Sequence, residues 1–276
     1  MTALTRRAAL TASLLAPIAA RAQANAIGTA ARPLRIGATA GPHSQVLEQV
    51  RDLAARPDGP GAGLVIRIVE FTDYIQPNAA LAAGELDANS YQHQPFLDQQ
   101  IRDRGYRLVV AGKTLVFPMG VYSRRFRTLD AVPEGARVAI PNDPTNGGRA
   151  LVLLAGGGLF TLRPGADFRA TVADIAANPK RIRILELEAA QIPRALEEVD
   201  AAAINTNFAI PAGLNPVRDA IRLESADSPY ANLIAVREQD REAPWVRRLV
   251  GAYQTDAVRD FVRTTFQGAV VPAFVR

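Results

Sequence analysis

The chain has 276 residues, with 32 Lys and Arg against 27 Asp and Glu, a formal net charge of +5 and no cysteine. This length suffices for one large core or two smaller domains, and without cysteine we expect neither disulfides nor a lipid-modified N-terminal cysteine. Because the arginines alternate with acidic residues, the sequence lacks the clustered cations of a phosphate-binding face, and we expect no nucleic-acid partner.

The first 24 residues have the pattern of a secretory signal peptide. Arg6 and Arg7 precede an uncharged apolar stretch from Ala8 to Ala20, and small residues up to Ala24 form a cleavage pattern. The apolar stretch is shorter than the roughly 20 residues that span a bilayer. Cleavage after Ala24 removes three arginines and no acid, which lowers the net charge from +5 to +2. We expect a soluble periplasmic chain, exported by either the general secretory or the twin-arginine route.

After residue 32, the hydrophobic period alternates between that of a strand and that of a helix, which predicts an α/β fold. The first elements expected are strand 34–40, a helix with its apolar face over 46–53, strand 64–71, helix 75–86, strand 87–91, helix 96–104 and strand 106–111. Strands that alternate with helices in this way imply parallel pairing.

A second series repeats the alternation. It predicts strands 116–123 and 136–141, a helix opened by Asn146, strand 182–187, helix 192–198, strands 201–205, 220–223 and 232–237, and one or two amphipathic helices within 245–266. We predict two lobes, each a mixed, mostly parallel sheet flanked by helices. Residues 33–115 plus 226–276 would form lobe I and residues 116–225 lobe II. A ligand cleft is expected between the lobes, at the carboxyl ends of strands.

The most distinctive polar segment runs from Ile140 to Ala150. Its residues 142–146 are mostly helix-capping types, and Gly147-Gly148 would let a ligand approach N–H groups that have no partner within the helix. Arg149 adds a guanidinium suited to bidentate contact with a carboxylate. The segment therefore predicts a site for a small carboxylate, with an ordinary capped helix and an exposed arginine as the alternative.

Four other polar segments fall at the ends of predicted strands, at residues 70–74, 90–96, 205–208 and 227–232. Taken singly, each fits core aromatics, turn formers or a capping histidine. Together they combine rings that can enclose an apolar side chain with neutral amides that can orient a zwitterion. That combination is typical of a ligand site.

An enzyme is the main alternative class. Ser44 adjoins His43, one of two histidines, yet neighbours in sequence make a poor catalytic triad and no serine lies in a Gly-x-Ser-x-Gly elbow. Two histidines without cysteine make a poor zinc site, and the run Gly156–Gly158 lacks the lysine of a phosphate loop. We expect no catalytic residue, no metal and no cofactor. A secreted hydrolase is the less favoured interpretation, and we expect His43 in a loop near the cleft.

A series of motifs, taken in order, resembles one family. They are EFTDYIQPN, DANSYQHQPFLD, GKTLVFPMGVYS, AIPNDPTNGGRAL, LELEAAQIPRAL, DAAAINTNFAI, DSPYANLIAVRE and GAVVP. They are similar to the NlpA-type, MetQ-like methionine-binding proteins of ABC importers, over nearly all of the chain after the leader. The resemblance implies a monomeric, two-lobed periplasmic binding protein of type II that closes on its ligand. It also implies delivery of the ligand to an inner-membrane permease with its ATPase.

The resemblance also implies roles for individual residues. Arg149 would hold the carboxylate of methionine, and Asn207 and Asn232 would orient its amino and carboxylate groups, with Asn205 as a near alternative. The wall around the thioether chain would consist of Tyr74, Tyr91, His93 and Phe96. Contacts between sulfur and aromatic edges contribute about 0.3–1.5 kcal/mol each.

The sequence departs from the family pattern at two places. Tyr91 stands where relatives often have phenylalanine and Phe96 where many have tyrosine, so the polarity of the pocket would differ. The family usually carries an acylated cysteine after its leader, whereas this chain has no cysteine, and we expect a freely diffusing form. D-Methionine, another small amino acid and a methionine-containing dipeptide stay open as ligands.

Overall fold

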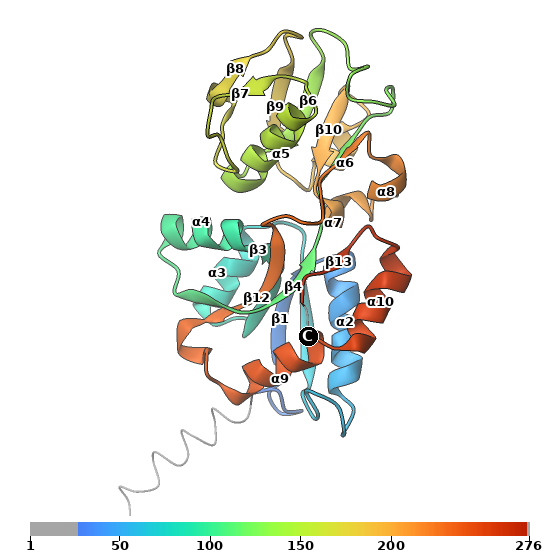
Figure 1. The fold of residues 1–276 in the computed structure, drawn as a ribbon. Coiled ribbons are helices and arrows are strands. Elements are labelled where there is room, and N and C mark those ends of the chain that lie inside the picture. Colours follow the sequence, from blue (N-terminus) through green and yellow to red (C-terminus); the bar gives the residue numbers. More distant parts are fainter. Residues whose placement is uncertain (1–26, 275–276) are drawn as a thin grey trace, which may run out of the picture.

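The computed structural model describes residues 27–274. The predicted signal peptide therefore lies outside the described residues. Two mixed sheets with flanking helices form two lobes, one above the other in Figure 1. Within residues 27–274, no helix combines the length and the apolar character needed to cross a membrane.

Lobe I is built on a six-stranded sheet of order β13-β4-β12-β3-β1-β2. Its strands are β1 (Leu34–Thr39), β2 (Ile66–Phe71), β3 (Ala88–His93), β4 (Leu108–Val116), β12 (Ala231–Arg237) and β13 (Val271–Pro272). Its helices are α2 (Pro42–Ala54), α3 (Gln76–Ala83), α4 (Gln94–Arg104), α9 (Pro244–Tyr253) and α10 (Asp256–Phe266). The buried face of α2 is the predicted one, with Val46, Leu47 and Val50 packed in the same core as residues of α9 and α10.

Lobe II is built on a five-stranded sheet of order β11-β5-β10-β6-β9. Its strands are β5 (Gly120–Tyr122), β6 (Arg137–Pro141), β9 (Arg183–Leu187), β10 (Ala201–Ile204) and β11 (Arg222–Leu223), with a separate pair β7 (Thr161–Leu162) and β8 (Ile175–Ala177). Its helices are α5 (Pro144–Gly156), α6 (Ile192–Ala195), α7 (Thr206–Ala209) and α8 (Pro216–Asp219). Lobe II has two separate apolar clusters. One includes residues of α5, and the other includes residues of α6 and α7.

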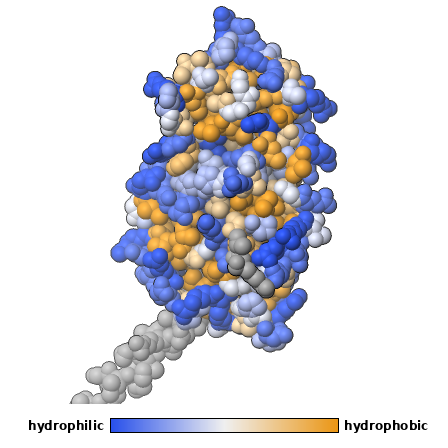
Figure 2. Space-filling view, in the orientation of Figure 1, coloured by the Kyte–Doolittle hydropathy of each residue, from blue (hydrophilic) through white to orange (hydrophobic). Residues whose placement is uncertain are grey.

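The chain passes between the two sheets along two crossover segments, residues 117–119 between β4 and β5 and residues 224–230 between β11 and β12. The segments are hydrogen-bonded to each other: the N–H of Glu224 donates to the carbonyl of Met119 at 3.0 Å, and the N–H of Met119 donates to Oε2 of Glu224 at 3.1 Å. In the space-filling view the lobes meet along this face without a wide opening between them (Figure 2). The lobe boundaries after residues 115 and 225 stay predictions.

The α/β class and the mixed sheets are confirmed, but the sheets are less parallel than predicted. Four strand pairs are parallel, β1–β2, β1–β3, β6–β9 and β6–β10. Strands β4 and β12 instead pair antiparallel with their neighbours, because the last part of the chain returns to lobe I and inserts β12 between β3 and β4. This insertion joins distant segments, so the local alternation of strands and helices does not reveal it.

The predicted boundaries are wrong around residue 116. A single strand was expected over 116–123, whereas β4 continues through Val116 and β5 begins at Gly120. Pro118 has no N–H to donate to a ladder, which accounts for the break. The segment 245–266 forms two helices, and Thr255 begins the second by accepting a hydrogen bond from the N–H of Val258 at 3.2 Å.

Candidate ligand-binding site

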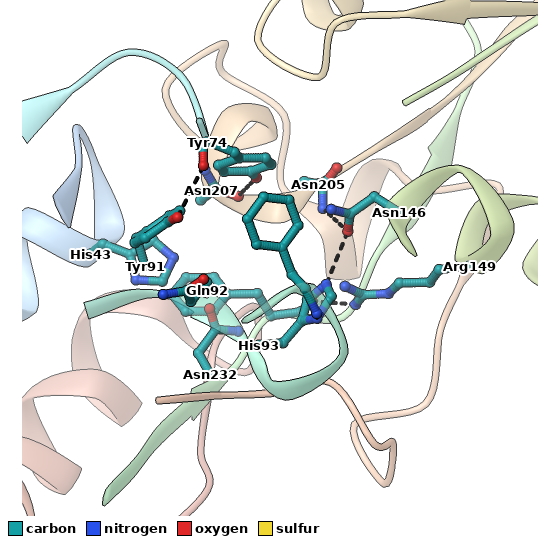
Figure 3. A pocket seen from close by; sticks show the side chains of 12 residues that line it. His43, Tyr74, Tyr91, Gln92, His93, Asn146, Arg149, Asn205, Asn207 and Asn232 are labelled. Carbon is teal, nitrogen blue, oxygen red and sulfur yellow. Dashed lines mark hydrogen bonds between the residues drawn. The ribbon is translucent and has the colours of Figure 1, made fainter. Parts of the chain in front are cut away.

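A hollow between the lobes brings together all eight residues predicted for the site. It includes about 330 Å³ of space free of protein atoms, part of which is open to solvent, and we call it the interlobe hollow. The predicted residues on its lining are Tyr74, Tyr91, His93, Phe96, Arg149, Asn205, Asn207 and Asn232. Four further residues complete the lining, His43, Gln92, Phe117 and Asn146, and Figure 3 shows the side chains around the hollow.

Three aromatic rings from lobe I form one wall. Tyr74 follows β2, Tyr91 lies in β3 and Phe96 lies in α4, with ring centroids 5.9–6.2 Å apart. The phenol of Tyr91 donates to the backbone carbonyl of Tyr74 at 2.9 Å. Burial raises the pKa of both phenols, so they stay protonated donors. Rings held in this way offer an apolar surface that can enclose an unbranched side chain.

His93 ends β3 and caps α4, so it faces the hollow in a fixed orientation (Figure 3). Its Nδ1 accepts from the N–H of Phe96 at 3.2 Å, which places the ring proton on Nε2, 3.2 Å from Oδ1 of Asn146. Burial lowers the pKa of His93 to about 3, and the charge of Arg149 contributes to the shift. His93 is therefore a neutral donor to the opposite lobe.

The asparagines are held in different ways. Asn205 donates through Nδ2 to Oδ1 of Asn146 at 2.9 Å, and its own buried Oδ1 has no partner within residues 27–274. Asn207 accepts from the Tyr74 phenol at 2.6 Å and thus joins lobe II to lobe I. Asn232 lies beside His93 in the register of β12 and β3.

The N-terminus of α5 is not the open anion site that the sequence predicts. Asp143 caps it by accepting from the N–H of Asn146 at 2.9 Å and from its side-chain amide, while burial raises the pKa of Asp143. Close packing requires glycine at both positions. A Cβ on Gly147 would lie 2.8 Å from the carbonyl oxygen of Pro141, and a Cβ on Gly148 would overlap the carbonyl oxygen of Phe168. The two glycines allow the helix to approach neighbouring backbone, not a ligand.

Arg149 is buried, so the alternative of an exposed arginine is wrong. Its Nε donates to Oε1 of Glu224 at 3.0 Å and its Nη2 to Oε2 at 2.5 Å. Nη2 also donates to the carbonyl of Phe117 at 2.8 Å, and the guanidinium lies 4.1 Å from the ring centre of Tyr230. The bidentate edge that was predicted to hold a ligand carboxylate is therefore occupied by Glu224. Nη1 makes no hydrogen bond to any residue of the described part of the chain.

His43 is not in a loop, as was expected, but is the second residue of α2 and is buried. Its ring lies 4.2 Å from that of Phe117, and burial lowers its pKa to about 3. Ser44 donates to the Gly41 carbonyl at 3.0 Å, not to the imidazole, so the two residues do not form a nucleophile and base. Across residues 27–274 no group of three or more His, Asp or Glu side chains could hold a metal ion.

The four additional lining residues differ in how far the sequence indicated them. Gln92 and Asn146 lie within motifs that were singled out. His43 was expected near the cleft but not as a site residue, and its position after β1 fits the convergence of strand ends at one sheet edge. Phe117 lies in the motif GKTLVFPMGVYS, but its assignment to a predicted strand gave no indication that it lines the hollow.

The fold and the hollow define a two-lobed substrate-binding protein of the periplasmic type. Residues 34–274 match the model of the NlpA lipoprotein family, and the chain belongs to this family. The D-methionine-binding lipoprotein MetQ of Salmonella typhi is 45% identical over 240 residues, which cover 86% of this chain and 87% of the relative. The Escherichia coli K12 protein of the same name is 43% identical over 240 residues, again 86% and 87% of the two chains.

Solved structures of similar proteins have the same fold as this chain. A nutrient binding protein from Burkholderia cenocepacia, bound to methionine, is 52% identical with a TM-score of 0.84, over 87% of this chain and 100% of that one. The methionine binding protein MetQ is 42% identical with a TM-score of 0.84, over 88% and 98%. The family consists of substrate-binding proteins of ABC transport, which confirms that the chain is not an enzyme.

Proposed function

We propose that the chain binds methionine in the interlobe hollow and delivers it to an inner-membrane ABC permease with its ATPase. The observation that carries the proposal is the convergence of one guanidinium, several neutral amides and three rings on a single hollow. Similar proteins named for methionine, and one solved with methionine bound, support the same ligand.

In the proposed complex, the methionine carboxylate meets Nη1 of Arg149, the donor that the described protein groups leave free. Asn205, Asn207 and Asn232 orient the amino and carboxylate groups. The thioether chain lies against Tyr74, Tyr91, His93 and Phe96. Each lobe contributes contacts, so the ligand would stabilise the closed arrangement that the permease recognises.

Calorimetric titration with L-methionine, D-methionine, norleucine and a methionine-containing dipeptide tests the proposal. We expect methionine to bind more tightly than norleucine, which has the same length but no sulfur. Native mass spectrometry of protein purified without added ligand is the complementary measurement, because a retained amino acid would identify the ligand directly. Failure of every amino acid and dipeptide to bind would refute the assignment.

We also propose a periplasmic location. The mature chain would begin after Ala24 and diffuse freely, although the similar proteins are named lipoproteins. Mass spectrometry of the protein recovered from its own cells tests this: we expect an unmodified chain that starts at Asn25. An acylated chain would contradict the free form and leave the binding function untouched.

A further inference from the structure

Glu224 is not part of the lining of the interlobe hollow, yet it governs the charge there. It is the acidic partner of Arg149. The side chain of Glu224 is 12% exposed and that of Arg149 is 3% exposed. A buried guanidinium without a partner would be costly, so the carboxylate of Glu224 stabilises the charged form of Arg149 inside the fold. The backbone N–H of Met119, on the other crossover segment, holds the same carboxylate at 3.1 Å.

Within residues 27–274, the partners of the Arg149 guanidinium come from the two crossover segments. Phe117 belongs to the first segment, and Glu224 and Tyr230 belong to the second. The planar guanidinium is therefore fixed on one edge and one face, and it presents Nη1 in one direction. Figure 3 shows the side chain of Arg149 pointing toward His93 at the hollow.

The positive charge on the lining of the interlobe hollow is already neutralised. Among the described residues Arg149 is the one charged group on that lining, and Glu224 cancels it. Both lining histidines are neutral, because burial lowers the pKa of each to about 3. A ligand carboxylate at Nη1 would therefore gain the attraction of the arginine and also meet the repulsion of a second carboxylate close by. Asp143, hydrogen-bonded to Asn146 behind the lining, would add to that repulsion when ionised.

An ammonium group on the ligand would offset that repulsion. Asn205, a residue of the lining, carries a buried Oδ1 that has no hydrogen-bond partner in the part of the chain that is described. A buried acceptor without a partner is unfavourable, and a donor on the ligand would satisfy it.

We propose that Glu224 determines the charge class of the ligand: by neutralising Arg149 it makes the interlobe hollow select zwitterions over anions that lack an ammonium group. This inference rests on the proposed function, since it concerns the same hollow. Glu224 acts through Arg149 and is a positioning residue. If it merely kept the lobe folded, its replacement would weaken all ligands alike.

The test compares methionine with 4-(methylthio)butanoate, the same molecule without its amino group, by calorimetric titration. We expect the wild-type protein to bind methionine at least about 30-fold more tightly than 4-(methylthio)butanoate. In Glu224→Gln this ratio of affinities should fall by roughly tenfold, because the repulsion between two carboxylates is removed. Glu224→Asp, which keeps the charge, should retain the wild-type preference. Glu238→Gln is the matched control, because Glu238 pairs with Arg107 at 3.1 Å on the surface.

An unchanged preference in a folded Glu224→Gln protein would overturn the inference and leave methionine binding intact. If that variant does not fold, Glu224→Ala takes its place in the same comparison, and in either case wild-type protein that binds 4-(methylthio)butanoate as tightly as methionine would overturn the inference. Wild-type protein that binds neither compound would overturn the proposed function as well.

Discussion

The phenol of Tyr74 donates a hydrogen bond of 2.6 Å to Oδ1 of Asn207, and this bond connects lobe I to lobe II at the edge of the interlobe hollow. Asn207 also donates from Nδ2 to Oγ1 of Thr39 at 3.4 Å. These contacts hold the two lobes against each other in the structure. Ligand affinity should therefore depend on groups that bridge the lobes as well as on groups that touch the ligand.

Tyr74→Phe removes the bridging hydroxyl and keeps the ring. We expect methionine affinity to fall by roughly 2- to 13-fold, which corresponds to one hydrogen bond of about 0.5–1.5 kcal/mol, because closure becomes less favourable. Calorimetry measures the change, with Tyr106→Phe as a control that lies away from the hollow. Equal affinities for Tyr74→Phe and wild type would show that this bond does not contribute to closure.

Arg149→Ala should abolish measurable methionine binding and also destabilise the protein, because Glu224 loses its partner inside the structure. Breaking a buried ion pair from one side costs about 3–5 kcal/mol. Adding Glu224→Gln to Arg149→Ala should restore more than about 1 kcal/mol of that stability without restoring binding. Denaturant unfolding of both variants measures this, and a double variant no more stable than the single one would contradict the ion-pair argument.

Stability should fall steeply as the pH drops below about 6.5, the ordinary pKa of a histidine. In the unfolded chain His43 and His93 bind protons near that value, whereas burial lowers the pKa of each to about 3 in the folded protein. Between these two pKa values the unfolded state binds more protons, so stability rises with pH by about 1.4 kcal/mol per unit for each histidine. The stabilisation is fully present above the unfolded pKa and is lost as the pH falls toward the folded one.

His93→Asn isolates one of these groups, because asparagine also caps a helix well and does not titrate. Unfolding measured from about pH 5 to about pH 6.5 should show a slope roughly half that of the wild type. A slope that does not change would mean that the His93 imidazole is already protonated in the folded protein.

Gly148→Ala should be destabilising, since its Cβ would overlap the Phe168 carbonyl oxygen. Overpacking of this kind costs about 1–3 kcal/mol. Gly156→Ala in the same helix meets nothing closer than 3.9 Å and should be neutral or stabilising by roughly 0.5–1 kcal/mol. Thermal unfolding of the pair tests the packing role, and a Gly148→Ala protein as stable as the wild type would contradict it.

The lining of the interlobe hollow could be predicted largely from the sequence, for physical reasons. Parallel strands of one open α/β sheet bring their carboxyl ends to one edge, so the polar segments at the ends of β2 and β3 converge, and the predicted cleft between the lobes brings the segment after β10 to the same place. The partner of Arg149 could not be predicted in this way. Glu224 lies 75 residues away, and its approach depends on how the two crossover segments pair.

The extent of antiparallel pairing in the lobe I sheet was underestimated for a related reason. Local alternation of strand and helix predicts parallel neighbours, but β12 reaches its place between β3 and β4 only after lobe II is complete. The glycines at 147 and 148 were assigned to ligand approach because their packing partners, Pro141 and Phe168, are recognisable only in three dimensions.

A crystal structure of the protein with methionine tests the central claim most directly. We expect the carboxylate within hydrogen-bond distance of Nη1 of Arg149, with Glu224 still on the opposite edge, and the thioether among the rings of Tyr74, Tyr91 and Phe96. An interlobe hollow that stays empty at saturating methionine, or a ligand whose carboxylate lies against the rings, would contradict it.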